Sequence, residues 1–246
     1  MTIAVVIPTL NEERILEATL THIVGVKFDE VIVVDGGSQD GTREIVSLFA
    51  SDVQGSTFDV ATTNLEPRTT PVTLLTSQPG RARQMNAGAA ASRSEVLLFL
   101  HADTLLPPNA RAEIEAALTD ATCVGGRFDV RFERDAGLPW LIARMMNLRS
   151  RWTGIATGDQ AIFVRRAAFE RLGGFQDIPL MEDVDFTRRL KQAGPMAALR
   201  VQAVTSFRRW DAGGPVRTIL MMWALRFLYW IGISPERLRH LYGAVR

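Results

Sequence analysis

The chain has 246 residues, of which 47% are hydrophobic and 22% charged, the balance of a globular protein with a sizeable core. A formal net charge of +1 points to neither nucleic acid nor an anionic membrane as a bulk partner. The single cysteine, Cys123, excludes an intramolecular disulfide and fits a reducing, cytoplasmic compartment. The apolar run at 3–7 is cut short by Pro8, which argues against a signal peptide.

The first hundred residues alternate between short apolar runs and helical patterns. Buried strands are predicted at 3–7, 30–35, 72–77 and 96–100. Helices are predicted at 11–24, with Asn11 as the N-cap, and at 42–50 and 81–92. Residues 51–71 are polar and are expected to form a surface excursion. Apolar strands separated by helices predict an α/β fold whose parallel sheet is covered on both faces.

The second half has a different pattern. Helices are predicted at 111–120, 138–154, around 167–172 and within 179–194. Strands are predicted at 158–166 and at 123–133, where the alternation indicates one solvent-exposed face. No internal repeat and no clear linker is visible. The sequence therefore predicts one α/β domain with a mixed, mostly parallel sheet, followed by a helical appendage from about residue 211.

The most apolar segment of the chain lies near its C-terminus, at residues 219–233. It is shorter than the ~20 residues that a membrane-spanning helix needs. Arg226 stands in its middle, where insertion into a bilayer would cost roughly 2.5–3.5 kcal/mol. We expect a helix packed on protein, with contact at a membrane surface or in a homodimer as the second interpretation.

Several polar side chains follow predicted strands, and ligands of parallel sheets bind at the carboxyl ends of strands. Asp35 precedes a Gly-Gly turn, where its carboxylate either caps the turn or accepts hydrogen bonds from a base or ribose hydroxyl. Arg81 and Arg83 stand near a helix start, a position that suits phosphate. Asp103 follows the strand "VLLFL", where one carboxylate together with diphosphate oxygens suits Mg²⁺ or Mn²⁺. His101 is a second candidate ligand, although a hydrogen bond at the strand end is the simpler role.

Two further stretches carry candidate chemistry. "MEDVDF" places Glu182, Asp183 and Asp185 at a predicted helix start, where acidic residues either complement the helix dipole or supply a general base. "SFRRW" places Arg208, Arg209 and Trp210 together, either to hold a diphosphate and stack on a ring or as a surface pair.

Taken together and in order, these stretches resemble the family 2 glycosyltransferases, whose catalytic domain has the GT-A fold. "VVIPTLNEE" and "VIVVDGGSQDGT" are similar to the family's first two strands and their turns. "LLFLHADT" stands where the family has its metal-binding D-x-D motif, with His101 at the first acidic position. "GGF" and "MEDVDFTRRL" stand at its acceptor loop and E-D pair, and "SFRRW" is similar to its Q-x-x-R-W segment. The likeness covers nearly the whole chain.

This resemblance implies an inverting transferase that moves a sugar from a nucleoside-diphosphate sugar to a hydroxyl acceptor, with Mn²⁺ or Mg²⁺ as the cofactor. It implies a catalytic domain at 1–210, with a donor half (1–105) and an acceptor half (106–210), and a helical appendage at 211–246. Asp183 would be the base, with Glu182 shaping its environment, and Asp103 would hold the metal, with His101 assisting. The implied donor-binding residues are Pro8, Thr9, Glu12, Asp35, Arg81, Arg83, Asp103, Arg208, Arg209 and Trp210, and the implied acceptor residues are Asp159 and Gln160.

A narrower resemblance, carried by "PGRARQMNAG", "TGDQAIFVRR" and the tail "RTILMMWALRFLYWIGISPERL", is to the bacterial arsenosugar-biosynthesis-associated glycosyltransferases. Two other classes stay open. A sugar-phosphate nucleotidylyltransferase has a similar fold, but its Gly-rich loop is replaced here by "PTLNEER". A non-catalytic nucleotide-sugar-binding relative is favoured by His101 and opposed by the intact "MEDVD".

Overall fold

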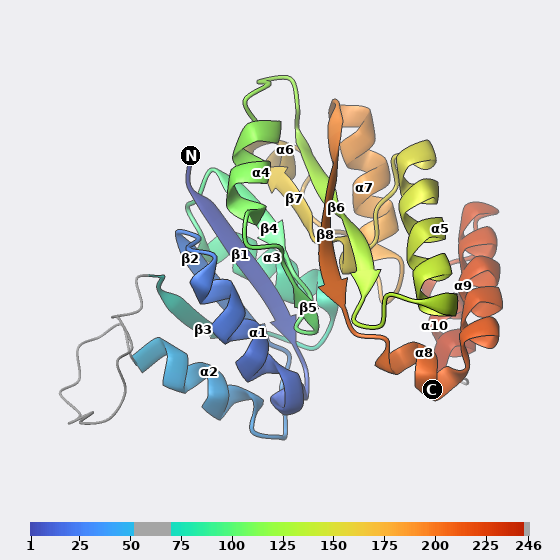
Figure 1. The fold of residues 1–246 in the computed structure, drawn as a ribbon, viewed down its shortest axis with the longest axis horizontal. Helices are drawn as coiled ribbons and strands as arrows, with labels where there is room; N and C mark the ends of the chain where they lie inside the picture. The colour runs from blue at the N-terminus through green and yellow to red at the C-terminus, as the bar shows by residue number, and fades with distance from the viewer. Residues whose placement is uncertain (52–69, 244–246) are drawn as a thin grey trace.

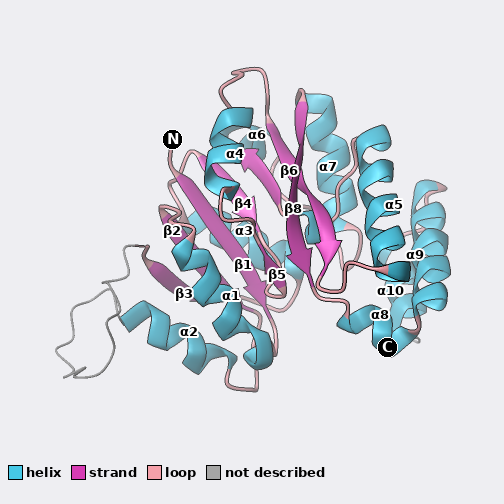
Figure 2. Ribbon diagram, in the orientation of Figure 1, coloured by secondary structure: helices cyan, strands magenta, loops and turns pink. Residues whose placement is uncertain are grey.

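A computed structural model describes residues 1–51 and 70–243 of the chain. Nearly all of the surface excursion predicted at 51–71 lies outside these residues. Within them, one sheet of eight strands runs through the molecule with helices on both sides (Figures 1 and 2).

The sheet has the strand order β3-β2-β1-β4-β7-β6-β8-β5. Its parallel half consists of β3 (Val72–Thr76), β2 (Glu30–Asp35), β1 (Ile3–Thr9) and β4 (Val96–Phe99). β7 (Ile162–Arg165) is antiparallel to β4 and to β6 (Gly125–Phe132), and β8 (Met196–Thr205) runs parallel to β6. The short strand β5 (Thr104–Leu105) closes the edge against β8. The prediction of a mixed, mostly parallel α/β sheet is confirmed.

Helices cover the two faces of the sheet because successive side chains of each strand point in opposite directions. Ile3, Val5 and Ile7 of β1 pack on the face covered by α1 (Glu13–Gly25), α2 (Thr42–Ser51) and α4 (Ala110–Ala117). Ala4 and Val6 pack on the opposite face, which is covered by α3 (Arg81–Ala91), α6 (Arg166–Arg171) and α7 (Glu182–Ala193). The apolar strands are buried on both sides, as their continuous apolar sequence predicted.

The C-terminal region adds three helices at one end of the sheet: α8 (Arg208–Gly213), α9 (Pro215–Trp230) and α10 (Pro235–Gly243). They lie beside α5 (Gly137–Thr153) in Figure 1. Ile142 of α5 and Ile219 of α9 pack in one cluster with Phe207. Leu225 of α9 packs with Met181, immediately before α7. The appendage is therefore anchored next to the acidic start of α7.

Four local predictions differ from the structure. Asn11 is not the N-cap of α1; its φ is 57°, and Glu12 takes the cap position. The strand predicted at 158–166 is a 3₁₀ turn (Gly158–Gln160) followed by β7. β8 was not among the strands predicted from the sequence. The fourth difference concerns β6.

The alternating strand at 123–133 was expected to have one wet face, and this is wrong. Its polar side chains Arg127 and Asp129 are buried, and they form an ion pair with each other. Arg151 of α5 completes the group through a 2.6 Å contact between its Nη2 and Oδ2 of Asp129. A helix covers this face, and paired charges are the form in which polar side chains tolerate such burial.

Candidate functional site

The carboxyl ends of the parallel strands lie at one edge of the sheet, where β1 and β2 end side by side with Thr9 opposite Asp35. Gln84 on α3 locks these ends together. Its buried Nε2 donates to the carbonyls of Thr9 and Val34, each at 2.7 Å. Gln84 was not among the predicted site residues, although a long polar side chain on the buried side of an Ala-rich helix is a signal that could have indicated it.

Asp35 is fully buried and shapes the turn that follows β2. Its carboxylate accepts hydrogen bonds from the backbone N–H groups of Gly37 and Ser38, both at 3.0 Å, and from the Ser38 hydroxyl. The capping role that the sequence left open is thus the one that the structure shows.

Three charged side chains from distant parts of the chain form what we call the strand-end cluster: Glu12, Asp103 and Arg208. Nη2 of Arg208 lies 3.5 Å from Oε2 of Glu12. The backbone N–H of Ser206 donates to the Asp103 carbonyl at 3.2 Å, which brings the start of α8 to the end of β4. Burial raises the pKa of Glu12, the negative charge of Asp103 raises this pKa further, and Arg208 opposes the rise. Two carboxylates and one guanidinium therefore meet at the strand ends.

His101 is held against the turn that precedes β7. Its Nδ1 lies 3.1 Å from Oδ1 of Asp159. A Cβ atom on Gly158 would stand 2.1 Å from Nε2 of His101, so the ring packs directly on a position that only glycine fits. This geometry supports the hydrogen-bonding role of His101 over that of a metal ligand.

The acidic pair lies at the N-terminus of α7. Oδ2 of Asp183 accepts a hydrogen bond from the backbone N–H of Gly158 at 2.8 Å, and Oδ1 accepts from Val184 at 2.7 Å. Glu182 is buried, and this burial, followed by the charge of Asp183, raises its pKa, whereas Arg81 lowers it. Through Gly158, Asp183 and the His101–Asp159 pair contact the same turn.

Asp185, the third acid of "MEDVDF", has a structural role. It is buried, and its Oδ2 pairs with Nε of Arg189 one turn further along α7 at 2.8 Å. Arg189 also donates to the carbonyls of Leu172 and Gly174, which fastens α7 to the preceding loop.

Some candidates lie outside this group. Arg83 pairs with Asp177 at 2.9 Å and donates to Gln78 at 2.8 Å on the surface. Gln160 is fully buried, and its Oε1 accepts from the Thr157 N–H at 3.3 Å.

Trp210 stacks on Phe207, with ring centroids 5.9 Å apart and an interplanar angle of 9°, so its ring belongs to a hydrophobic cluster. Pro8 lies within β1, and the side chain of Arg209 is outside the described part of the chain.

In residues 1–51 and 70–243, no three or more His, Cys, Asp or Glu side chains gather as a metal site would require. Asp103 and the nearby Glu12 are the carboxylates available at the strand ends. This donor set fits a Mg²⁺ or Mn²⁺ ion that takes few protein carboxylates and completes its coordination with phosphate oxygens and water.

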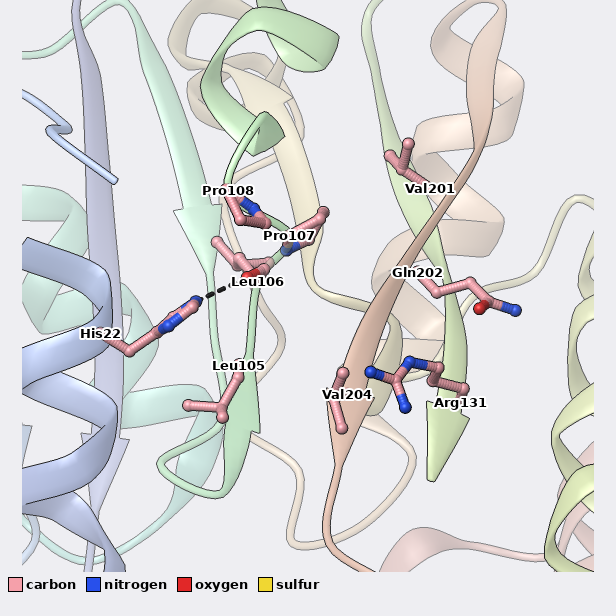
Figure 3. A pocket seen from close by; sticks show the side chains of 9 residues that line it. All are labelled: His22, Leu105, Leu106, Pro107, Pro108, Arg131, Val201, Gln202 and Val204. Atoms are coloured by element: carbon pink, nitrogen blue, oxygen red, sulfur yellow. Dashed lines mark hydrogen bonds between the residues drawn. The ribbon is translucent and has the colours of Figure 1, made fainter. Parts of the chain in front are cut away.

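A separate cavity of about 450 Å³ lies between β5, β8 and α1 (Figure 3). His22, Leu106 and Arg131 are among its lining residues, and Nε2 of His22 lies 2.6 Å from the Leu106 carbonyl. None of the predicted site residues lines it.

The fold defines a class, the proteins with a GT-A-like fold. The structure is similar to TarS from S. aureus, with a TM-score of 0.62 and 18% identity over 84% of this chain and 60% of that one. It is also similar to the mannosyltransferase PcManGT from Pyrobaculum calidifontis, solved in complex with GDP-Man and Mn²⁺, with a TM-score of 0.63 and 23% identity over 82% of this chain and 56% of that one. At these identities the likeness shows the fold.

Sequence comparison gives the family. Residues 4–173 match the model of glycosyl transferase family 2, and the chain belongs to that family. It is 27% identical over 217 residues to the probable glycosyltransferase YdaM of Bacillus subtilis, covering 78% of this chain and 47% of YdaM. It is 26% identical over 205 residues to the glycosyltransferase AglE of Haloferax volcanii, covering 78% of this chain and 62% of AglE. The chain thus spans about half to three-fifths of these relatives.

Proposed function

We propose that the protein is an inverting glycosyltransferase that moves a sugar from a nucleoside-diphosphate sugar to a hydroxyl acceptor. One observation carries the proposal. Gly158 donates a hydrogen bond to Asp183 at the start of α7 and packs against His101, which follows β4. The acidic start of α7 therefore lies near the carboxyl ends of the strands, where α/β sheets bind their ligands. Membership in family 2 supports the same chemistry.

The donor side is assigned to the strand ends. Arg208 and Arg81 supply positive charge for the diphosphate, because both act electrostatically on Glu12 at the end of β1. Pro8, Thr9 and Asp35 form the rim of the nucleotide subsite, with Asp35 contributing through the turn that it caps. Arg83, Arg209 and Trp210 complete the predicted donor set, although Arg83 must first leave Asp177 and Trp210 must leave Phe207.

A divalent cation, Mn²⁺ or Mg²⁺, is assigned to Asp103. The Mn²⁺ of the PcManGT complex supports this choice. When bound, such an ion neutralises the charge that develops on the diphosphate leaving group. The assistance of His101 is indirect: its bond to Asp159 keeps the turn at Gly158 in place.

The acceptor side is assigned to the start of α7 and the 3₁₀ turn. Asp183 takes the proton of the acceptor hydroxyl while the acceptor oxygen bonds to the anomeric carbon and the bond to the diphosphate breaks. One displacement inverts that carbon and needs no covalent nucleophile. Two backbone N–H groups bind the Asp183 carboxylate and orient it. Asp159 and Gln160 position the turn that the acceptor meets.

The function is tested by a thermal-shift screen of nucleotide sugars with and without Mn²⁺, followed by a donor-hydrolysis assay. We expect at least one donor to raise the melting temperature, because a ligand that binds the native state stabilises it. Pyrophosphate release from a nucleoside triphosphate would instead support a nucleotidylyltransferase. Donor binding with neither hydrolysis nor transfer would support a non-catalytic relative. Cytoplasmic location and the arsenosugar-associated subgroup stay predictions.

We also propose that the C-terminal helices contact an anionic lipid surface peripherally. None of the described helices is long and apolar enough to cross a membrane. Instead, α9 exposes one apolar stripe at intervals of three or four residues, comprising Val216, Leu220, Trp223, Phe227 and Trp230. Trp140 and Trp152 of the neighbouring α5 are also exposed, and Arg144 and Arg217 supply positive charge beside them. Tryptophan and arginine together are typical of membrane interfaces.

The double substitution of Trp223→Ser and Phe227→Ser is expected to weaken binding to phosphatidylglycerol-containing vesicles about tenfold or more, since burying one such side chain contributes ~1.5–3 kcal/mol. Co-sedimentation measures this binding. Equal binding by both proteins would contradict the lipid contact, and a concentration-dependent dimer that the same variant abolishes would assign the stripe to a second copy of the chain.

A further inference from the structure

Two arginines of the C-terminal half are buried with unpaired nitrogen atoms. Nε and Nη2 of Arg149 on α5 are buried without a hydrogen-bond partner, and its Nη1 reaches only the Ile155 carbonyl, at 3.5 Å. Nε of Arg226 on α9 is likewise buried and unpaired. Guanidinium groups stay charged in proteins, and an unpaired buried charge is costly. These two positions therefore need an explanation.

Both guanidinium groups lie within electrostatic range of Asp183 at the start of α7. Ile155, the partner of Arg149, lies three residues before Gly158, whose N–H holds Asp183. Leu225, the neighbour of Arg226, packs in one cluster with Met181 and Val184, which stand on either side of the acidic pair. Burial, followed by the positive charge of Arg226, lowers the pKa of Arg149 to about 10, and the negative charge of Asp183 opposes this shift. The two positive charges are therefore close enough to repel each other.

No carboxylate neutralises them directly. In the described part of the chain, neither Arg149 nor Arg226 forms an ion pair within 4.0 Å. Asp183 and Asp159 act on Arg226 only across a longer distance. Buried nitrogen atoms of both guanidinium groups thus lack a partner within the described residues. Their planar forks match the oxygens of a phosphate group.

The donor diphosphate already has its own cations. Arg208 and Arg81 belong to the strand ends, with Glu12. Arg149 and Arg226 come from α5 and α9, which pack together through Ile142 and Ile219 and lie on the side of β6 away from the parallel strands in Figure 1. A second anion-binding pair on the acceptor side indicates a second anionic group in the reaction.

We propose that the acceptor of this enzyme carries a phosphate group, and that Arg149 and Arg226 bind that phosphate next to Asp183. The proposal rests on the proposed function, in which Asp183 is the base that meets the acceptor. Binding the phosphate pairs both buried guanidiniums and directs the acceptor hydroxyl toward the base. The phosphate belongs either to a phospholipid or to a water-soluble phosphate ester, since the recognising chemistry is the same.

Arg226→Gln is the test. Inorganic phosphate is titrated into the full-length protein by calorimetry, and vesicles of phosphatidylcholine with and without phosphatidic acid are used in co-sedimentation. Removing one charge-assisted contact is expected to weaken phosphate binding about tenfold or more. Arg171→Gln, which changes an exposed arginine at the end of α6, is the matched control and is expected to bind phosphate like the unmodified protein. If Arg226→Gln does not fold, Arg226→Lys replaces it, because lysine keeps the charge but loses the fork.

The outcomes separate the alternatives. Equal phosphate affinity in Arg226→Gln and the unmodified protein overturns the proposal. A loss of phosphate affinity in Arg208→Gln but not in Arg226→Gln also overturns it, because that result places the phosphate at the donor site. A selective loss of binding to phosphatidic acid supports a phospholipid acceptor, and a loss for inorganic phosphate alone supports a soluble one. Failure of nucleotide-sugar binding would refute the proposed function without altering the phosphate titration.

Discussion

Asp183→Asn is expected to lower glycosyl transfer by about 10²–10⁴-fold, the usual contribution of a general base. The amide is nearly isosteric, and its oxygen can still accept a hydrogen bond from Gly158 or Val184, which the carboxylate binds at 2.8 and 2.7 Å. What it cannot do is accept the proton of the acceptor hydroxyl. The affinity for the nucleotide sugar is expected to stay nearly unchanged, because Glu12, Asp103 and Arg208 meet at the strand ends instead.

The variant should also fold normally. The charge of Asp183 helps to raise the pKa of the buried Glu182, and a raised carboxyl pKa means that the folded state disfavours ionisation. Removing that charge relieves this penalty but also removes a favourable interaction with Arg149 and Arg226, so the melting temperature is expected to change little. Glu17→Gln replaces an exposed carboxylate on α1 by an amide and is the control for the assay. A collapse of donor affinity with transfer largely retained would refute the assignment of Asp183 as the base.

Asp103→Asn is the second substitution with a large expected effect. In the unmodified protein, Mn²⁺ should increase the affinity for the nucleoside diphosphate, because the ion joins the Asp103 carboxylate to the phosphate oxygens. The amide is a neutral and weaker ligand, so the affinity measured with Mn²⁺ is expected to fall to the value measured without it. Calorimetric titration of UDP and GDP, each with Mn²⁺ and with a chelator, measures this difference.

The melting temperature shows whether this variant also folds normally. The negative charge of Asp103 contributes to the raised pKa of Glu12, so its removal lowers a repulsion in the folded state and should not destabilise the protein. A nucleotide affinity that is independent of Mn²⁺ in both proteins would contradict the metal role of Asp103. Glu12→Gln, tested in the same titration, shows whether the second carboxylate of the strand-end cluster also holds the ion.

The central elements of the fold were predictable because their signals are local. The strand at 30–35 was predicted with the bounds of β2, and the helix at 81–92 differs from α3 by one residue at its end. β6 shows the limit of this approach. Its alternation is a local property, whereas the burial of its polar face depends on α5 covering it. β8 was missed because most of its side chains are half-buried or exposed, so it lacks the continuous apolar run of the central strands.

The candidate site divides in the same way. Asp35, His101, Asp103 and Asp183 could be located from sequence, since each stands at the end of a strand or the start of a helix, where position along the chain already implies a position in space. The contacts between them could not be foreseen. The packing of His101 on Gly158 and the hydrogen bond from Gly158 to Asp183 join three segments that are far apart in the chain.

The sequence by itself therefore determined the α/β architecture, the GT-A likeness and the main acidic and basic candidates. Hydrophobic periodicity and the polar residues at strand ends depend only on residues that are neighbours in the chain. Only the tertiary structure decided which candidates lie together. In the structure, Arg83 forms an ion pair with Asp177, and Trp210 stacks on Phe207. The fold also brought Arg226, which in sequence only interrupts an apolar helix, within electrostatic range of Asp183. The physical reason is that charges and close packing act through space, and the distances that govern them are set by the whole fold.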